Sequence, residues 1–254
     1  MKYDRKSYRT ILEYAIDQGY RFVDYANVDL AHEAGKQIIL RHDIDFSPEM
    51  ALEMAEIDAS CNISSTFALL LTSPLYNVLS QDSLKTIENV HLLGHHIALH
   101  YGIPADYSDE KICKDINIEM KILKELLSYI KPVFVWHNLP PNSLFDHIVV
   151  PGMINAYAAK FTKNMHYISD SITRHTPEDF LNALSKYRLL HFLLHPIIWM
   201  SERDDMLSML ACEMIRKIRH CDRTFRNNQA WKEKYPHGIQ PDILQRLEDW
   251  LVNP

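Results

Sequence analysis

The chain is predicted to fold as an α/β protein, a complete or incomplete (β/α) barrel with about seven strands. Apolar runs with the length of buried strands alternate along the sequence with segments of helical periodicity. Five such runs end in histidine or aspartate side chains, the place where parallel barrels gather their active sites. With only six glycines and no linker or repeat, residues 1–254 are expected to form one domain. The five runs are Gln37–Asp45, His96–Tyr101, Val133–Asn138, His166–Ser171 and His191–Pro196.

Helices and strands alternate through the first half of the chain. The expected elements are a helix over 5–19, a short strand over 21–25, a strand over 37–44, a helix from 48 to about 60, a strand over 65–71 and a helix over 82–93. The helix at 48 has the clearest start. Ser47 is its expected N-cap, Pro48 stands at the first helical position, and Glu49 places an acid in the first turn.

The second half continues the alternation with shorter strands. Its expected elements are a strand over 96–101, a helix from 108 to about 129, a strand over 133–137, a proline-rich loop over 139–142, short strands near 154–158 and 166–170, a helix starting at 176, a strand over 191–195, a capped helix from 201 and a polar, helical or irregular tail over 222–254. The helix from 108 carries a continuous apolar stripe. The stripe consists of Ile112, Ile116, Met120, Leu123 and Leu127.

Composition excludes several classes of function. The net charge is −6 and no basic cluster is present, so a nucleic-acid partner is not expected. The apolar stretches are shorter than the roughly 20 residues that span a bilayer. The first 20 residues favour an amphipathic helix over a signal peptide, so a cytoplasmic protein is expected. The four cysteines form no Cys-x-x-Cys pair, which argues against a thiolate zinc site. Nothing indicates the oligomeric state.

The first run holds an unusual group of charges. Side chains alternate along a strand, so Arg41, Asp43 and Asp45 share one face, with the carboxylates about 7 Å apart. A cation beside them would relieve their repulsion, and a divalent metal does this well. Arg41 would orient one of the carboxylates. The structural alternative is a charged layer of the barrel that is closed by an Arg–Asp pair.

Three histidines end other strands and are candidate metal ligands. His100, His137 and His195 follow separate apolar runs, so their imidazoles are expected near Asp45 at the barrel mouth. Imidazole and carboxylate ligands suit zinc, iron, cobalt or nickel. A buried core histidine is the better reading of any one of them alone, whereas the set favours a site. His95 and His96 precede their strand and are expected at its opposite end, away from the site.

The motifs together resemble the polysaccharide deacetylase superfamily, also called carbohydrate esterase family four. The resemblance spans roughly residues 37–200, with helical extensions on both sides. It implies a distorted (β/α)7 barrel that hydrolyses N-acetyl groups on sugars with a divalent metal. It is closest to a cytoplasmic branch associated with surface-polysaccharide biosynthesis. The motifs that carry it are RHDID (41–45), SSTFALLL (64–71), GHHIALHY (94–101), WHNLPP (136–141), YISDS (167–171) and LLHP (193–196).

The resemblance implies a metal site of one divalent ion, zinc in the first place, with cobalt, nickel or iron as alternatives. Asp43 matches the general base and Asp45 the metal ligand, but Ile44 separates them where the family has adjacent aspartates, so the two roles can be exchanged. His100 matches the first metal histidine. The second would stand at position 104, which is Pro104 here. His137, at the place of a family arginine, is the replacement ligand that we expect.

The resemblance also implies the proton donor. His195 matches the late histidine that acts as general acid, and Asp170 matches the aspartate that pairs with it and raises its pKa. The metal polarises the amide and activates water, and His195 protonates the leaving amine.

Substrate contacts are expected from Arg41, Tyr101, Trp136, Arg174 and Trp199. Aromatic faces stack on sugar rings, although tryptophans beside strands are more often part of the core. Arg174 follows the loop after Asp170, where it would meet an anionic group such as a nucleotide or a uronate, or simply be solvated.

The favoured function is therefore a metal-dependent hydrolase that removes an N-acyl group, acetyl or formyl, from an amino sugar or a nucleotide- or lipid-linked sugar precursor. Two alternatives remain open. One is a non-catalytic sugar-binding relative that lost its metal together with the second histidine. The other is a metal-dependent phosphoesterase, which would usually need more ligands for two ions and basic residues at the mouth.

Overall fold

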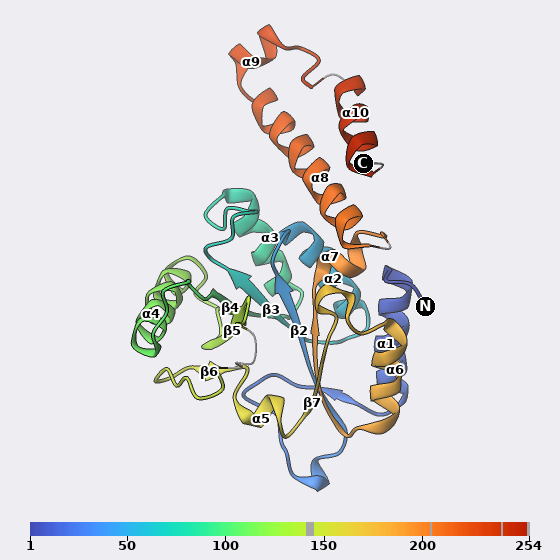
Figure 1. Ribbon diagram of the computed structural model, residues 1–254, viewed down its shortest axis with the longest axis vertical. Helices are drawn as coiled ribbons and strands as arrows, with labels where there is room; N and C mark the ends of the chain where they lie inside the picture. The colour runs from blue at the N-terminus through green and yellow to red at the C-terminus, as the bar shows by residue number, and fades with distance from the viewer. Residues whose placement is uncertain (141–144, 204, 240, 253–254) are drawn as a thin grey trace.

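A parallel β-sheet forms the centre of the computed structural model, which describes residues 1–140, 145–203, 205–239 and 241–252 (Figure 1). Its strands run in the order β6-β5-β4-β3-β2-β8-β7, β1 pairs with β2, and every pairing is parallel. The predicted fold class is confirmed, because the strands and the helices between them form a distorted (β/α) barrel. The strands are β1 (Arg21–Phe22), β2 (Gln37–Ile44), β3 (Thr66–Leu70), β4 (His96–Gly102), β5 (Val133–His137), β6 (Ile154–Asn155), β7 (His166–Ser169) and β8 (Leu189–Leu194).

Helices cover the outside of the sheet and follow the predicted order. The Ser47 side chain accepts a hydrogen bond from the backbone N–H of Met50, with Pro48 at the helix start, as its sequence predicts. The helices are α1 (Arg5–Asp17), α2 (Pro48–Ser60), α3 (Gln81–Leu92), α4 (Asp109–Leu126), α5 (Ala159–Thr162), α6 (Pro177–Lys186), α7 (Pro196–Met200), α8 (Met206–Arg226), α9 (Gln229–Lys234) and α10 (Pro241–Val252), with short 3₁₀ turns at His32–Ala34 and Ser171–Thr173. None of the helices that the structure describes is long and apolar enough to cross a membrane.

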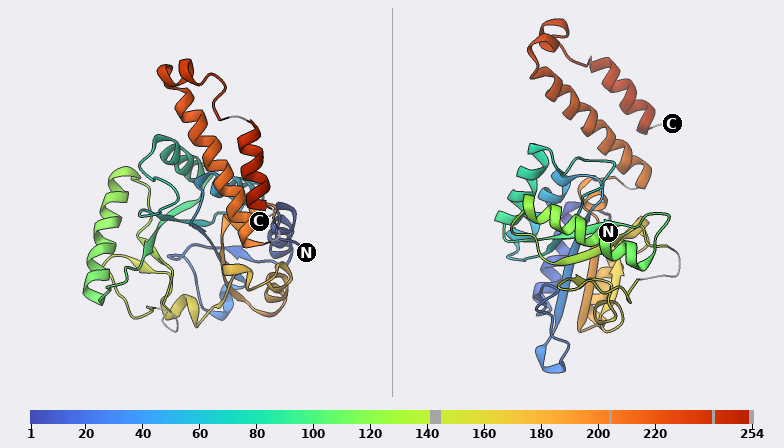
Figure 2. Two further views of the ribbon diagram at one scale, coloured as in Figure 1. Left: turned by 45° about the horizontal axis from the view of Figure 1, so that its top comes forward. Right: turned by 90° about the vertical axis from the view of Figure 1, so that its left-hand side faces the viewer.

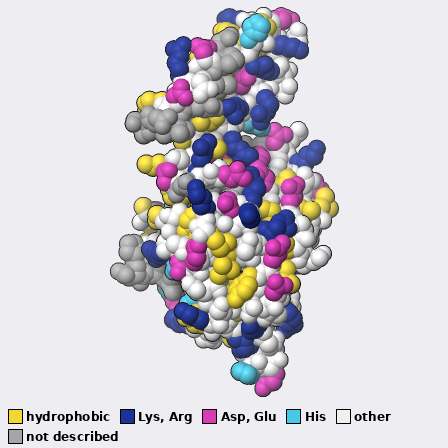
Figure 3. Space-filling view, turned by 90° about the vertical axis from the view of Figure 1, so that its right-hand side faces the viewer, with side chains coloured by type: hydrophobic (Ala, Val, Ile, Leu, Met, Phe, Trp, Pro, Cys, Tyr) yellow, Lys and Arg dark blue, Asp and Glu magenta, His cyan; other side chains and the backbone are white. Residues whose placement is uncertain are grey.

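The C-terminal helices form an arm, α8 to α10, that extends away from the barrel (Figures 1 and 2). The helix expected from Ser201 begins later, at Met206 of α8 after its N-cap, Asp205, and the short helix α7, which ends at Met200, precedes it. An ion pair of 2.8 Å joins Arg216 of α8 to Glu53 of α2. Figure 3 shows basic and acidic side chains gathered where the arm meets the barrel. The described part of the predicted polar tail is helical.

A network of buried polar groups lies behind β2, on the face opposite Asp43. Asp58 is fully buried and accepts hydrogen bonds from the Ser65 hydroxyl at 2.6 Å and from the Tyr8 hydroxyl, and pairs with His42 at 2.9 Å. The Ser65 hydroxyl also lies 3.1 Å from Nδ1 of His95, whose Nε2 lies 2.9 Å from a backbone carbonyl oxygen of α2. His95 is therefore a structural residue at the far end of β4, as predicted.

The network predicts a large stability effect at one carboxylate. Replacing Asp58 by Ala would remove the acceptor that three buried groups share, and each buried donor that is left unpaired costs about 1–3 kcal/mol. We expect Asp58→Ala to lower the free energy of unfolding by roughly 3 kcal/mol or more in urea denaturation. The exposed Asp17, on α1, provides the control, because surface substitutions change stability by within about 0.5 kcal/mol. Equal stability of the two variants would show that the network contributes nothing.

Candidate metal centre

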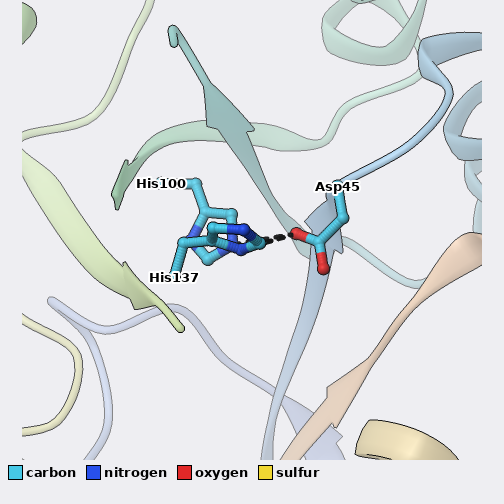
Figure 4. Close-up of side chains that lie close together, drawn as sticks. All are labelled: Asp45, His100 and His137. Atoms are coloured by element: carbon cyan, nitrogen blue, oxygen red, sulfur yellow. Dashed lines mark hydrogen bonds and ion pairs between the residues drawn. The ribbon is translucent and has the colours of Figure 1, made fainter. Parts of the chain in front are cut away.

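Three side chains that could hold a metal ion converge at the carboxyl end of the sheet (Figure 4). Nε2 of His100 lies 3.0 Å from Oδ1 of Asp45, and Nδ1 of His137 lies 3.3 Å from the same oxygen. The two imidazole nitrogens are 3.1 Å apart. Figure 4 shows both rings directed at the carboxylate. One oxygen and two nitrogens therefore face a common point.

The strand ends explain this convergence. Asp45 directly follows β2, while His100 and His137 come from the neighbouring strands β4 and β5. Gly102 pairs with His137 in the register, so His137 stands one pleat beyond His100 toward the barrel mouth. Asn138 has a left-handed backbone, φ 55°, which an asparagine tolerates well, and it turns the chain out of β5 immediately after the ligand.

The donor set fits a divalent ion. Zinc bonds to nitrogen and oxygen are about 2.0–2.1 Å long, so two ligands of a tetrahedral site stand about 3.3 Å apart. The three observed separations, 3.0, 3.1 and 3.3 Å, are close to that value. Nε2 of His137 is 3.0 Å from the amide nitrogen of Asn138. Nδ1 of His100 is buried without such a partner among the described residues.

Charge also favours a cation at this point. Burial alone would raise the pKa of Asp45, but the hydrogen bonds with His100 and His137 outweigh it and lower the pKa well below its usual value. Asp45 is therefore a carboxylate at neutral pH. Pro104, the position of the second histidine in the family pattern, is not among the residues that line the cavity at this centre, and His137 lies at the centre instead.

Asp43 lies beside the three ligands but has a different partner. Both of its oxygens accept hydrogen bonds of 2.8 Å from Arg41, through Nε and Nη2. Burial would raise the pKa of Asp43, but the Arg41 guanidinium outweighs it and holds the pKa below its usual value. Oδ2 of Asp43 is 3.7 Å from Nε2 of His100. The two aspartates thus have different partners: Asp45 lies with the two histidines of the candidate metal site, and Asp43 is held by Arg41.

His195 and Asp170 form the second chemical unit. Nδ1 of His195 lies 2.6 Å from Oδ1 of Asp170, and Oδ2 of Asp170 accepts hydrogen bonds from the His195 backbone N–H at 2.9 Å and from the Trp199 indole at 2.7 Å. Pro196 begins α7 and keeps His195 extended, so the imidazole leaves the end of β8 toward the site. Nε2 of His195 is 3.8 Å from Oδ2 of Asp45.

Asp170 controls the charge of His195. Burial alone would lower the pKa of His195, but the adjacent Asp170 carboxylate, with Asp45 and Asp43, outweighs it and raises the pKa to about 9. His195 therefore carries a proton at neutral pH. A protonated imidazole is able to donate a proton at neutral pH.

Asp43, Asp45, His100, His137 and His195 all line one cavity of about 800 Å³. That volume is within the range of small-molecule sites. The wall combines apolar and aromatic side chains with a few polar ones. Its residues include Asp43, Asp45, His100, Trp136, His137, Asn138, Leu139, Tyr157, Tyr167, Ser169, Ser171, Ile172, Arg174, His175, His195, Ile198 and Met206.

The expected substrate contacts are only partly placed on this wall. Trp136 and Arg174 line the cavity, whereas Arg41, Tyr101 and Trp199 do not. Arg41 lies one layer deeper and holds Asp43. Tyr101 follows His100 on its strand, so it points to the opposite face, where its hydroxyl is 3.4 Å from Asp115 of α4. Trp199 is fully buried and bonds to Asp170, so these three expected sugar contacts are corrected to supporting residues.

Other cavity residues were not anticipated from the sequence. Tyr157 and Tyr167 both contribute to the wall, and so does Asn138. Tyr167 and Ser169 are two residues apart on β7, so they share the face that leads to the site, and strand alternation could have identified them. Tyr157 follows the two-residue strand β6, which gives no comparable signal. Pro141 of the WHNLPP motif lies outside the described residues.

Comparison with known proteins gives similarities of fold. No protein-family model matches the chain, and neither does any curated protein sequence. The barrel resembles that of polysaccharide deacetylases. A chitin deacetylase from Colletotrichum lindemuthianum is 12% identical, with a TM-score of 0.42 over 70% of this chain and 80% of the other. A deacetylase from Streptococcus pyogenes, solved with acetate, is 14% identical, with a TM-score of 0.45 over 70% and 86%. A carbohydrate esterase family four pseudoenzyme from Bacillus anthracis is 15% identical, with a TM-score of 0.45 over 78% and 68%.

Proposed function

We propose that the protein is a metal-dependent hydrolase that removes an N-acyl group, acetyl or formyl, from an amino sugar. One observation carries the proposal: a triangle of candidate metal-donor atoms opens on the same cavity as His195, which is paired with Asp170. A Lewis acid beside a proton donor is what amide hydrolysis requires, because the carbonyl oxygen gains negative charge and the amine needs a proton to leave.

Each residue then has a role. Asp45, His100 and His137 hold the divalent ion, which supplies Lewis-acid chemistry toward the acyl carbonyl and toward water. Asp43 is ionised and directed by Arg41, so it accepts the proton that the attacking water loses. His195 donates its Nε2 proton to the amide nitrogen as the carbon–nitrogen bond breaks. Water and the amide are thereby converted to a carboxylate and a free amine.

The wall of the cavity favours a sugar substrate. Tyr167 is a partly exposed aromatic side chain on the wall, beside the more deeply buried Trp136 and Tyr157, and sugar rings pack well against aromatic surface. We propose a nucleotide- or lipid-linked precursor of a surface polysaccharide, following the resemblance of the motifs, with turnover in the cytoplasm. The direct test is to supply the metal-loaded protein with N-acetyl and N-formyl amino sugars, free and nucleotide-linked, and to measure carboxylate and amine release together. Release of phosphate from a generic phosphodiester, with no amine formed, would favour the phosphoesterase alternative.

Arg174 is proposed to select an anionic substrate. It is exposed on the cavity wall, and its guanidinium has no hydrogen bond or ion pair with any residue that the structure describes. We expect Arg174→Met to raise KM for a nucleotide-linked N-acyl sugar about tenfold, because a charge-assisted hydrogen bond is lost. KM for the neutral free sugar and kcat for both should stay unchanged.

The matched control for Arg174 is Arg9→Met. Arg9 lies on α1, outside the cavity, where its guanidinium donates to Ser60. Steady-state kinetics with the paired substrates checks the prediction. An equal rise in KM for charged and neutral sugars would contradict a role in recognising the anion.

A further inference from the structure

Two tyrosines at the floor of the cavity are connected to the catalytic aspartate through one nitrogen. Nη2 of Arg41 donates to Oδ2 of Asp43 at 2.8 Å and to the Tyr157 hydroxyl at 2.9 Å. The Tyr157 hydroxyl lies 3.3 Å from the Tyr167 hydroxyl. Both tyrosines line the cavity, Tyr157 with 4% of its surface exposed and Tyr167 with more.

The direction of these hydrogen bonds follows from the chemistry of arginine. A guanidinium has only donors, so the oxygen of Tyr157 must accept from Arg41. The two hydroxyl groups carry two hydrogens, and the contact between them uses one. The other hydrogen has no acceptor among the residues that the structure describes. Either hydroxyl can be the donor of the contact between them. When Tyr157 donates to Tyr167, the hydrogen of Tyr167, the more exposed of the two residues, is left for the cavity.

The Tyr167 hydroxyl stays protonated at neutral pH and can therefore donate a hydrogen bond. Burial, with a smaller effect of Tyr157, raises the pKa of Tyr167 well above its usual value, so the hydroxyl keeps its proton. Polar groups in sites of this depth are almost always paired, by protein, water or ligand. The pair therefore has one hydroxyl hydrogen available to the cavity, and Tyr167 is the more exposed of its two members.

We propose that the Tyr167 hydroxyl donates a hydrogen bond to an oxygen of the bound N-acyl sugar, and that Arg41 and Tyr157 fix its direction. The inference rests on the proposed function, which supplies the substrate class. The acceptor oxygen belongs either to the acyl group or to the sugar. An acyl oxygen gains charge during the reaction, so loss of a hydrogen bond to it would lower kcat. A sugar oxygen is bound equally before and during the reaction, so loss of a hydrogen bond to it would raise KM.

The test is Tyr167→Phe, which removes one hydroxyl and keeps the ring. We expect kcat/KM to fall about tenfold with full metal content, the effect of losing one hydrogen bond. Tyr14→Phe, on α1, is the matched control, because its hydroxyl lies 3.2 Å from that of Ser185 and outside the cavity. Tyr157→Phe should give a smaller loss of kcat/KM, since it leaves the Tyr167 hydroxyl present but undirected.

The outcomes separate this inference from the proposed function. A fall in kcat or a rise in KM in Tyr167→Phe supports it and assigns the oxygen to the acyl group or to the sugar. Unchanged values overturn it while the proposed function stands. If the wild-type protein hydrolyses no N-acyl sugar, the proposed function fails. The Tyr167 contact is then tested by N-acetylglucosamine binding, followed through tryptophan fluorescence, since Trp136 lines the cavity. About tenfold weaker binding in Tyr167→Phe supports the contact, and equal or absent binding overturns it.

Discussion

Asp45→Asn and His137→Ala are each expected to release the divalent ion and to abolish turnover. His137→Ala removes one of the three donors that face the common point, and Asp45→Asn replaces a carboxylate donor by a weaker, neutral amide. Asp45→Asn also removes the negative charge that the two imidazoles cannot supply. Since even outer contacts of metal ligands are worth 10–100-fold in affinity, metal affinity should fall by more than about a hundredfold. Turnover should fall roughly a thousandfold or more, because the Lewis acid supplies several kcal/mol to the transition state.

Elemental analysis after reconstitution with zinc, cobalt or nickel checks this, with one ion per chain expected in the wild-type protein. His32→Ala is the control, because His32 is exposed on the loop between β1 and β2. Full occupancy in His137→Ala would remove that histidine from the ligand set. No ion in the wild-type protein under any of these metals would favour the sugar-binding alternative without catalysis.

Much of the candidate site follows from one regularity of the sequence. Parallel strands end at the same edge of a sheet, so the polar residues that terminate separate apolar runs must meet there. Asp45, His100 and His137 lie at the ends of three strands and come together. Asp170 and His195 do the same at the ends of β7 and β8. The fold class depends on the same alternation of strands and helices, which is why it could also be predicted.

The direction of a single side chain could be predicted only within a regular strand, where successive side chains alternate between the two faces. Tyr101 adjoins His100, so alternation alone places it on the opposite face, and its assignment to the substrate was inconsistent with that rule. Trp199 is a different case. It lies on α7, and the packing of that short helix beneath Asp170 decides where the indole points. Helix docking of this kind leaves no periodic signal in the sequence.

His195→Gln is expected to lower kcat between about a hundredfold and ten-thousandfold, the usual contribution of a positioned proton donor. Glutamine preserves the size and polarity of the side chain but cannot deliver a proton. The metal content should remain that of the wild-type protein, because His195 contacts Asp45 only at 3.8 Å and lies outside the donor triangle. Loss of metal in this variant would make His195 a ligand, and unchanged kcat with metal present would end its role as the acid.

The pH profile distinguishes an acid from a residue that merely shapes the cavity. The active form of His195 is protonated, so kcat should decline as pH rises through its pKa of about 9. Asp170→Asn removes the carboxylate that raises this pKa and leaves burial, which lowers it. The declining limb should therefore move to lower pH by at least about one unit, since one unit corresponds to only 1.36 kcal/mol of interaction. A limb that stays in place in Asp170→Asn, or persists in His195→Gln, must belong to another group.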